Sequence, residues 1–248
     1  MQETFLVAQL QQQEILLSAT KMFIGHTISA AKPATGNFGP TSIDSILFDS
    51  ASSSFPASSV TWTQAHTTAG TDRYLTVFVQ TLSATDDLTG VTYAGASMTF
   101  VTKIQNPHSA GWLYAYSLIN PAVGANNIVV SFTTAKIGAL AGASYTGCRQ
   151  LAQPTTSVTS SLANSTTFSL TTTTTTNFEH LIAFTVDNIG SSTAGVNTTR
   201  TAAFSAGSGQ QLFRSTASQT PAGSKSLNFA NIDVTTDWVG IMVSIASL

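Results

Sequence analysis

The chain has 248 residues, of which 8% are charged, and its formal net charge is −2 at pH 7. Serine and threonine together exceed a quarter of the residues, and the nine Lys and Arg residues are spread singly along the sequence. This composition lacks the basic surface that binds nucleic acid, and the lone Cys148 excludes an intrachain disulfide.

Residues 1–40 differ in composition from the rest of the chain. Phe5, Leu6, Leu10 and Leu17 fall near helical spacing, and residues 32–40 form a Pro/Gly-rich connector. We expect an N-terminal arm that docks on a neighbouring subunit, or alternatively an extra edge strand on the chain's own domain. Gln and Glu residues interrupt the apolar positions of 1–20, so this segment does not read as a secretory signal. No stretch approaches the ~20 apolar residues of a membrane-spanning helix.

From residue 43 onward the pattern predicts β-strands. Apolar residues alternate with Ser and Thr, and turn residues recur at short intervals. Leu75, Val77 and Val79 are expected on one face of their strand, and Ala94-Gly95 in a tight hairpin. The expected strands are 43–49, 60–63, 74–80, 91–93, 97–104, 112–116, 128–132, 137–145, 166–172, 180–186, 210–215, 226–230 and 237–244, with a loop over 50–56.

About a dozen short strands without a convincing helix after residue 40 predict an all-β fold. The expected architecture is an antiparallel β-sandwich of jelly-roll type, with a domain over 41–248 preceded by the arm and linker of 1–40.

The order of segments resembles a noncatalytic β-sandwich module found in phage structural proteins and in secreted bacterial multidomain proteins. The resemblance covers about four-fifths of the chain and implies a role in assembly, display or adhesion, with no functional residues carried over. The matching segments are FDSASS at 48–53, VTWT at 60–63, DRYLTV at 72–77, VTYAG at 91–95, WLY at 112–114 with Asn120-Pro121, AGASYTG at 141–147, GQQL at 209–212 and DWV at 237–239.

Catalytic motifs are weak in this sequence. Residues 142–147 (GASYTG) come nearest to a Gly-x-Ser-x-Gly nucleophile elbow around Ser144, but they hold one residue too many and sit in a predicted strand. Asp86-Asp87 is the only adjacent acidic pair. It reads as a turn former, with Ca²⁺ ligation as the less favoured reading. A hydrolase would need an acid/base pair brought together from Asp86, Asp87, Glu179, Asp187 and Asp237.

The remaining chemistry-bearing side chains also favour structural roles. His26, His66, His108 and His180 lack the spacing of a zinc site, and Cys148 is expected to be an inert packed thiol. We expect no catalytic, cofactor or metal residues. The strand aromatics are expected in the core rather than on a sugar-binding surface, namely Trp62, Trp112, Tyr114, Tyr116 and Trp238.

The sequence therefore predicts a noncatalytic virion protein of a bacteriophage, a capsid decoration or tail/fibre component. Its expected partners are copies of itself and neighbouring virion proteins. The alternative is a secreted or cell-surface module for carbohydrate binding or adhesion, with surface glycans as partners.

Overall fold

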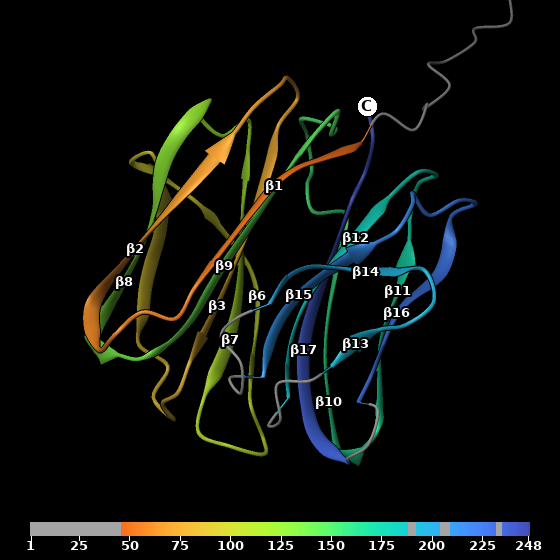
Figure 1. Cartoon of the computed structure of the whole chain (residues 1–248). Helices are drawn as coiled ribbons and strands as arrows, with labels where there is room; N and C mark the ends of the chain where they lie inside the picture. The colour runs from red at the N-terminus through yellow and green to blue at the C-terminus, as the bar shows by residue number, and fades with distance from the viewer. Residues whose placement is uncertain (1–45, 188–191, 204–208, 232–234) are drawn as a thin grey trace, which may run out of the picture. The chain divides into compact units, whose positions relative to one another are not determined.

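The computed structural model describes residues 46–187, 192–203, 209–231 and 235–248, and these contain strands and turns but no helix (Figure 1). They belong to one compact unit, Ser42–Leu248. The predicted arm and linker of 1–40 lie outside the described residues. The all-β and antiparallel predictions are both confirmed, since the described residues form no helix and every strand pair among them is antiparallel.

The first half of this unit is a sandwich of two sheets. Its inner sheet has the strand order β1-β9-β3-β7-β6, and its outer sheet has the order β2-β8-β4-β5. The strands are β1 Leu47–Ser54, β2 Ser59–Thr68, β3 Tyr74–Thr81, β4 Leu88–Tyr93, β5 Ala96–Ser97, β6 Thr99–Gln105, β7 Trp112–Ile119, β8 Gly124–Lys136 and β9 Gly138–Thr146.

The second half is another sandwich. Its inner sheet has the order β10-β17-β12-β15-β14, and its outer sheet has the order β11-β16-β13. The strands are β10 Thr156–Ser165, β11 Thr167–Thr174, β12 His180–Asp187, β13 Thr193–Ala194, β14 Thr198–Ala203, β15 Gln210–Ser215, β16 Gly223–Ala230 and β17 Thr236–Ile245.

The two sandwiches repeat one strand order. If β1 is matched with β10, β2 with β11, β3 with β12 and so on, with β5 lacking a counterpart, both pairs of sheets have the same arrangement. The repeat extends to detail, because the edge strands β6 and β14 carry bulges at matching places, between Phe100 and Thr102 and between Arg200 and Ala202. The unit is therefore an internal structural duplication.

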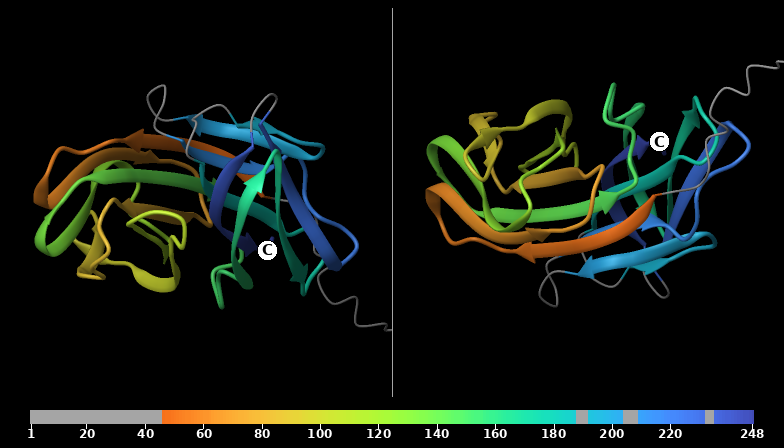
Figure 2. Two further views of the ribbon diagram at one scale, coloured as in Figure 1. Left: turned by 90° about the horizontal axis from the view of Figure 1, so that it is seen from below. Right: turned by 90° about the horizontal axis from the view of Figure 1, so that it is seen from above.

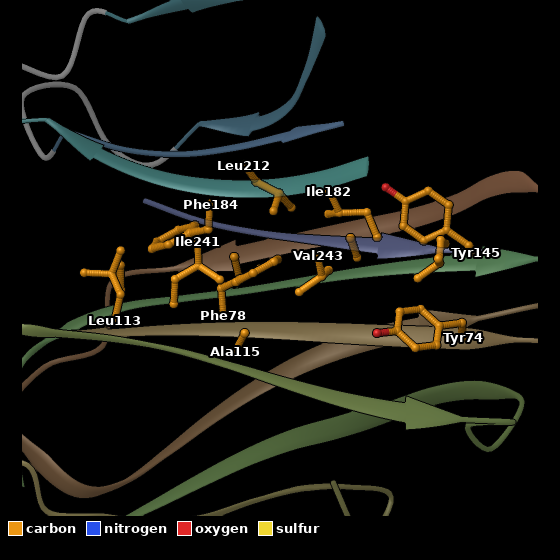
Figure 3. Close-up of a cluster of buried hydrophobic side chains, with 14 of the residues drawn as sticks. Tyr74, Phe78, Leu113, Ala115, Tyr145, Ile182, Phe184, Leu212, Ile241 and Val243 are labelled. Carbon is orange, nitrogen blue, oxygen red and sulfur yellow. The ribbon is translucent and has the colours of Figure 1, made fainter. Parts of the chain in front are cut away.

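Four sheets stack in layers, with the two inner sheets face to face (Figure 2). One core cluster fills each sandwich, and a third joins the two inner sheets. In this shared core the rings of Phe78 and Phe184 stack, and the side chains around them come from both inner sheets (Figure 3). Most of the shared-core residues from β7 and β9 are alanines, whereas most of those from β12, β15 and β17 are the larger Ile, Val and Leu.

Most predicted strands are present, and the face assignments that we tested hold. Leu75, Val77 and Val79 lie together in the first sandwich core, and Ala94-Gly95 forms the β4–β5 turn with both φ angles positive (49° and 80°). Gly95 adopts this backbone region without steric cost, whereas the Cβ of Ala94 makes it less favourable there.

Two expectations were wrong. We predicted a loop over 50–56, but Ser50–Ser54 continue β1 because their alternate side chains hydrogen-bond to β2 across the sandwich. We also predicted no strand over 156–165, where the structure has β10. The strand β10 was missed because Ser, Thr and Asn dominate it and half-exposed edge positions show no apolar alternation.

Candidate functional site

Polar side chains line the side of the first sandwich where β1 and β2 are the edge strands of their sheets. Ser50, Ser52 and Ser54 are spaced by two residues on β1, as Gln64 and His66 are on β2, so each set points to one face. We call this cluster the β1–β2 seam; its members are Asp49, Ser50, Ser52, Ser54, Gln64, His66 and Ser144.

The seam contains a directional chain of hydrogen bonds. Ser54 donates to Gln64 Oε1 (2.5 Å), and Gln64 Nε2 donates to Ser52 Oγ (2.6 Å). Ser52 Oγ lies 2.8 Å from His66 Nδ1, while Ser50 Oγ lies 3.4 Å from His66 Nε2 and donates to the Thr67 carbonyl. Because the Ser50 hydroxyl proton is directed to that carbonyl, this chain assigns the imidazole proton to Nε2 and makes Nδ1 the acceptor.

His66 is held neutral in this position. Its side chain is 3% exposed, and burial lowers its pKa to about 4, although the charge of Asp49 opposes the shift. A Cβ on Gly142 would approach His66 Nδ1 and Ser52 Oγ to 3.4 and 3.3 Å and Ile128 Cδ1 to 2.8 Å. The glycine in β9 therefore provides space for the imidazole.

The seam brings Ser, His and Asp together without the relay of a serine hydrolase. Ser144 is a buried strand residue whose hydroxyl donates to Asp49 Oδ2 (2.7 Å), and the same oxygen accepts the N–H of Ala69 (3.0 Å). In a catalytic triad the carboxylate contacts the imidazole and orients it. Here serines occupy both ring nitrogens, so the hydrogen bonds serve to tie the two edge strands together.

The second sandwich has a matching seam in which hydroxyls take these places, and Thr155 links Ser244 to the carboxylate of Glu179. Ser244 Oγ lies 2.6 Å from Thr156 Oγ1, which accepts from Thr172 Oγ1 at 2.9 Å. These residues correspond to Ser144, Ser50 and His66. Thr68 and Thr174, two residues after His66 and Thr172, also match: their hydroxyls donate to the carbonyls of Ala122, just before β8, and of Gly223, the first residue of β16.

The adjacent acids Asp86 and Asp87 each meet a lysine. Asp86 pairs with Lys103 and accepts from the Tyr114 hydroxyl (2.9 Å), while Asp87 lies 3.0 Å from Lys136 Nζ. Lys136 is 6% exposed and also donates to two hydroxyls of the same loop. These contacts fix the β3–β4 loop to β6 and β8, in keeping with a structural role for the pair.

The other three candidate acids, Glu179, Asp187 and Asp237, are in the second sandwich. Glu179 is fully buried, and its carboxylate accepts from Thr155, from the N–H groups of Thr175 and Thr176, and from both of their hydroxyls. Asp187 ends β12, and Asp237 of β17 accepts the N–H of Asn164 (3.0 Å). Asp86 and Asp87 thus lie in the first sandwich and the three remaining candidate acids in the second.

The described residues hold no group of three or more His, Cys, Asp or Glu side chains that could bind a metal ion. His66, His108 and His180 occur in β2, a loop and β12, and His26 lies outside the described residues. Cys148 is buried, and burial together with Asp72 raises its pKa to about 12, which keeps the thiol protonated.

The strand aromatics are core residues, as predicted. Trp62, Trp238, Tyr114 and Tyr116 are buried. Trp112 is half-buried, with Lys103 Nζ 5.1 Å from its ring centroid and Tyr114 stacked beside it. Its indole N–H donates to the Ala84 carbonyl, so both the ring and the N–H of Trp112 are already in contact with other groups of the protein.

The sequence reasoning missed the seam. Its signal was present in the alternation of Ser50, Ser52 and Ser54 on one strand and Gln64 and His66 on the next. Nothing in the sequence alone indicated that these two sets would face each other across a sandwich.

In the described part of the chain there is no helix long and apolar enough to cross a membrane. Comparison of the chain with models of known protein families, with curated proteins and with solved structures gave no match.

Proposed function

We propose that this chain is a noncatalytic structural protein of a bacteriophage particle, a capsid decoration or tail/fibre component that acts through subunit contacts. One observation carries the proposal. The duplication places an uncharged sheet face outward in both outermost layers of a single chain.

The outward face of the first sandwich consists of small and hydroxyl side chains. Thr61, Thr63, Ala65 and Thr67 of β2 point away from the core. Their partners on β8 are Ser131, Val129, Asn127 and Ala125. A shallow groove of about 470 Å³ crosses this face, lined by Ala65, Ala94, Gly95, Ala125, Asn126, Asn127 and Val129.

The outward face of the second sandwich has the same character. Thr167, Ser169, Thr171 and Thr173 of β11 lie opposite Ala230, Asn228, Ser226 and Ser224 of β16. Cross-strand hydrogen bonds join Ser169 to Asn228 and Thr171 to Ser226, both at 2.7 Å. Faces without charge do not repel one another, and two such faces on one chain favour repeated contacts between copies.

The strand order supports the finer assignment to the jelly-roll type. If β5 is left out of the count, the first, eighth, third, sixth and fifth strands of each half form one sheet in that order, and the second, seventh and fourth form the other. In the first half the chain from β5 to β6 pairs first with β4 and then with β7, so one edge segment serves both sheets. Jelly rolls are frequent in viral capsid proteins and lectins.

The alternative, a carbohydrate-binding or adhesion module, has less support. Sugar-binding surfaces use exposed aromatic rings, but the tryptophans of this chain are buried or covered by neighbouring side chains. The same scaffold could still present a glycan site, so binding to a glycan array is the measurement that would favour this alternative.

Two measurements test the proposal. Antibodies against the chain should label phage particles released from the source culture, and the label should persist after density-gradient purification. Light scattering of Met1–Leu248 beside Thr41–Leu248 should give trimers or larger assemblies for the full chain and a smaller mass for the truncated one.

Charge on an outer face supplies a matched comparison. Thr63→Glu on β2 or Ser169→Glu on β11 should reduce assembly, whereas Ser109→Glu in an exposed loop should not. A monomeric full chain that is absent from purified particles and binds a glycan would replace the structural proposal with the binding module.

A further inference from the structure

The β1–β2 seam closes one side of the first sandwich. Its two strands belong to different sheets, and each is an edge strand without a backbone partner on its free side in the described sheets. Six contacts cross between β1 and the segment of β2 and Ala69: Asp49 to the Ala69 N–H, Ser50 to the Thr67 carbonyl and to His66, Ser52 to His66 and to Gln64, and Ser54 to Gln64. These side-chain hydrogen bonds hold the edges together where no sheet ladder does.

His66 is the link in this chain that can change its charge in mildly acidic solution. In the neutral state Nδ1 accepts from Ser52, whose oxygen already accepts from Gln64. A proton on Nδ1 would face the Ser52 hydroxyl proton, so Ser52 would have to rotate and accept two donors. The hydrogen bond between Ser52 and His66 would then have to change direction beside a buried imidazolium cation.

The surroundings of His66 offer that cation little compensation. Asp49 on β1 is the one carboxylate whose charge acts on it, and its Oδ2 is already engaged by Ser144 and Ala69. Tyr93 on β4 presents its ring to the imidazole at 6.1 Å, and its hydroxyl donates to the His66 carbonyl (3.2 Å). Gly142 and Ser144 on β9 and Ile128 on β8 supply no charge.

The duplicated sandwich provides the contrast. At the place of His66 it has Thr172, and the seam there consists of Thr156, Thr172 and Ser244. The hydroxyl at this place does not titrate, and Glu179, which accepts from Thr155 beside Ser244, has a pKa below its usual 4.5 and stays charged at pH 5. The same architecture therefore occurs once with a link that can take up a proton between pH 7.5 and pH 5 and once without it.

We propose that the β1–β2 seam is an acid-released latch, in which protonation of His66 opens the β1–β2 side of the first sandwich while the second sandwich stays closed. This inference goes beyond the proposed particle role and does not depend on it. Opening would separate the free edges of β1 and β2. The unpaired backbone N–H and C=O groups along such edges are the groups that pair with an added strand.

The direction follows from linkage. The pKa of His66 is about 4 in the folded chain against a usual 6.5, so the opened state binds the proton more readily. Closure is therefore weakened as pH falls from about 6.5 to about 4, and at pH 5 the closed state should lose roughly 30-fold in its equilibrium with the open one.

The test is hydrogen exchange on the full chain at pH 7.5 and pH 5.0, with rates corrected for the intrinsic pH dependence of amide exchange. Protection of β1 and β2 amides should fall roughly 30-fold, and protection of β10 and β11 amides should change little. An equal change in both sandwiches, or no change in β1 and β2, would overturn the latch.

Two variants separate the latch from a general acid effect. His66→Gln keeps a neutral donor and acceptor at this place, and His66→Thr copies the second sandwich. Both should lose the pH-dependent part of the β1–β2 exchange at pH 5.0. His180→Gln, in β12, serves as the control and should retain it. Retention in the folded His66→Gln chain would contradict the proposal.

Discussion

Phe78 of β3 stacks on Phe184 of β12, with ring centroids 5.7 Å apart and an interplanar angle of 10°. Each is the fifth residue of its strand, and β3 and β12 occupy the same place in the two sandwiches. The duplication thus brings a residue into contact with its own counterpart, as a two-fold axis does in a symmetric dimer.

Truncation of this pair should destabilise the whole unit. Phe78→Ala and Phe184→Ala each remove a fully buried ring and should lower the free energy of unfolding by about 3–5 kcal/mol. In urea unfolding, the double variant should lose about 0.5–1.5 kcal/mol less than the sum of the single losses, because the stacking interaction is removed only once. Strict additivity would show that the rings are not coupled.

The alanines of β9 should be sensitive to enlargement. Ala141→Leu adds volume in the shared core, where Ala141 is fully buried, and should cost about 1–3 kcal/mol. Ala65→Leu makes the same change on the outward face of β2 and should stay within about 0.5 kcal/mol of the parent. Thermal unfolding of the two variants compares them, and similar losses would argue against a tightly packed interface.

The two lysine–aspartate pairs of the β3–β4 loop should differ in strength. Lys136→Ala leaves Asp87 without its partner at a site where the two side chains are 6% and 12% exposed, and it should cost about 3–5 kcal/mol. Lys103→Ala disrupts the more exposed pair with Asp86 and should cost at most about 1 kcal/mol. Chemical denaturation gives both values, and equal costs would remove the distinction between the pairs.

Glu179 should contribute to acid sensitivity below pH 4.5. Burial alone would raise its pKa, but hydrogen bonds from Thr155, Thr176 and neighbouring groups outweigh that effect, so the pKa lies below the usual 4.5. The folded state therefore binds the proton less readily, and the stabilisation present above pH 4.5 is lost as pH falls through the folded pKa.

Glu179→Gln isolates this effect. The substitution replaces a charged acceptor with a neutral one and should cost about 1–3 kcal/mol at pH 7. It should also flatten the decline in stability between pH 4.5 and pH 3, as measured by urea unfolding at each pH. An unchanged decline would assign the acid sensitivity to other groups.

Strand identity could be predicted where aromatic and aliphatic residues recur along the strand. Tyr74–Thr81 and Thr236–Ile245 are buried on both faces, and their apolar residues indicated both strands correctly. The same rule failed for Thr156–Ser165, whose Ser, Thr and Asn side chains are mostly exposed or half-exposed. Edge strands lack the burial that produces the pattern.

The duplication escaped the sequence because topology was retained while side chains diverged. Phe78 and Phe184 match, as do Ser144 and Ser244, but Ala141 pairs with Phe78 where Ile241 pairs with Phe184. The seam was also hidden, since the contact between Ser144 and Asp49 spans 95 positions of the chain. Such pairs become neighbours only through the register of the sheets.

The two inner sheets contribute side chains of different size to the shared core, and this difference determines which halves can pack against each other. Two first sandwiches brought together would set alanine against alanine and leave space between the sheets, while two second sandwiches would crowd Ile and Val against their own kind. Each half has thus become the specific counterpart of the other. Crowded copies of this chain are thereby discouraged from pairing through two first halves or through two second halves.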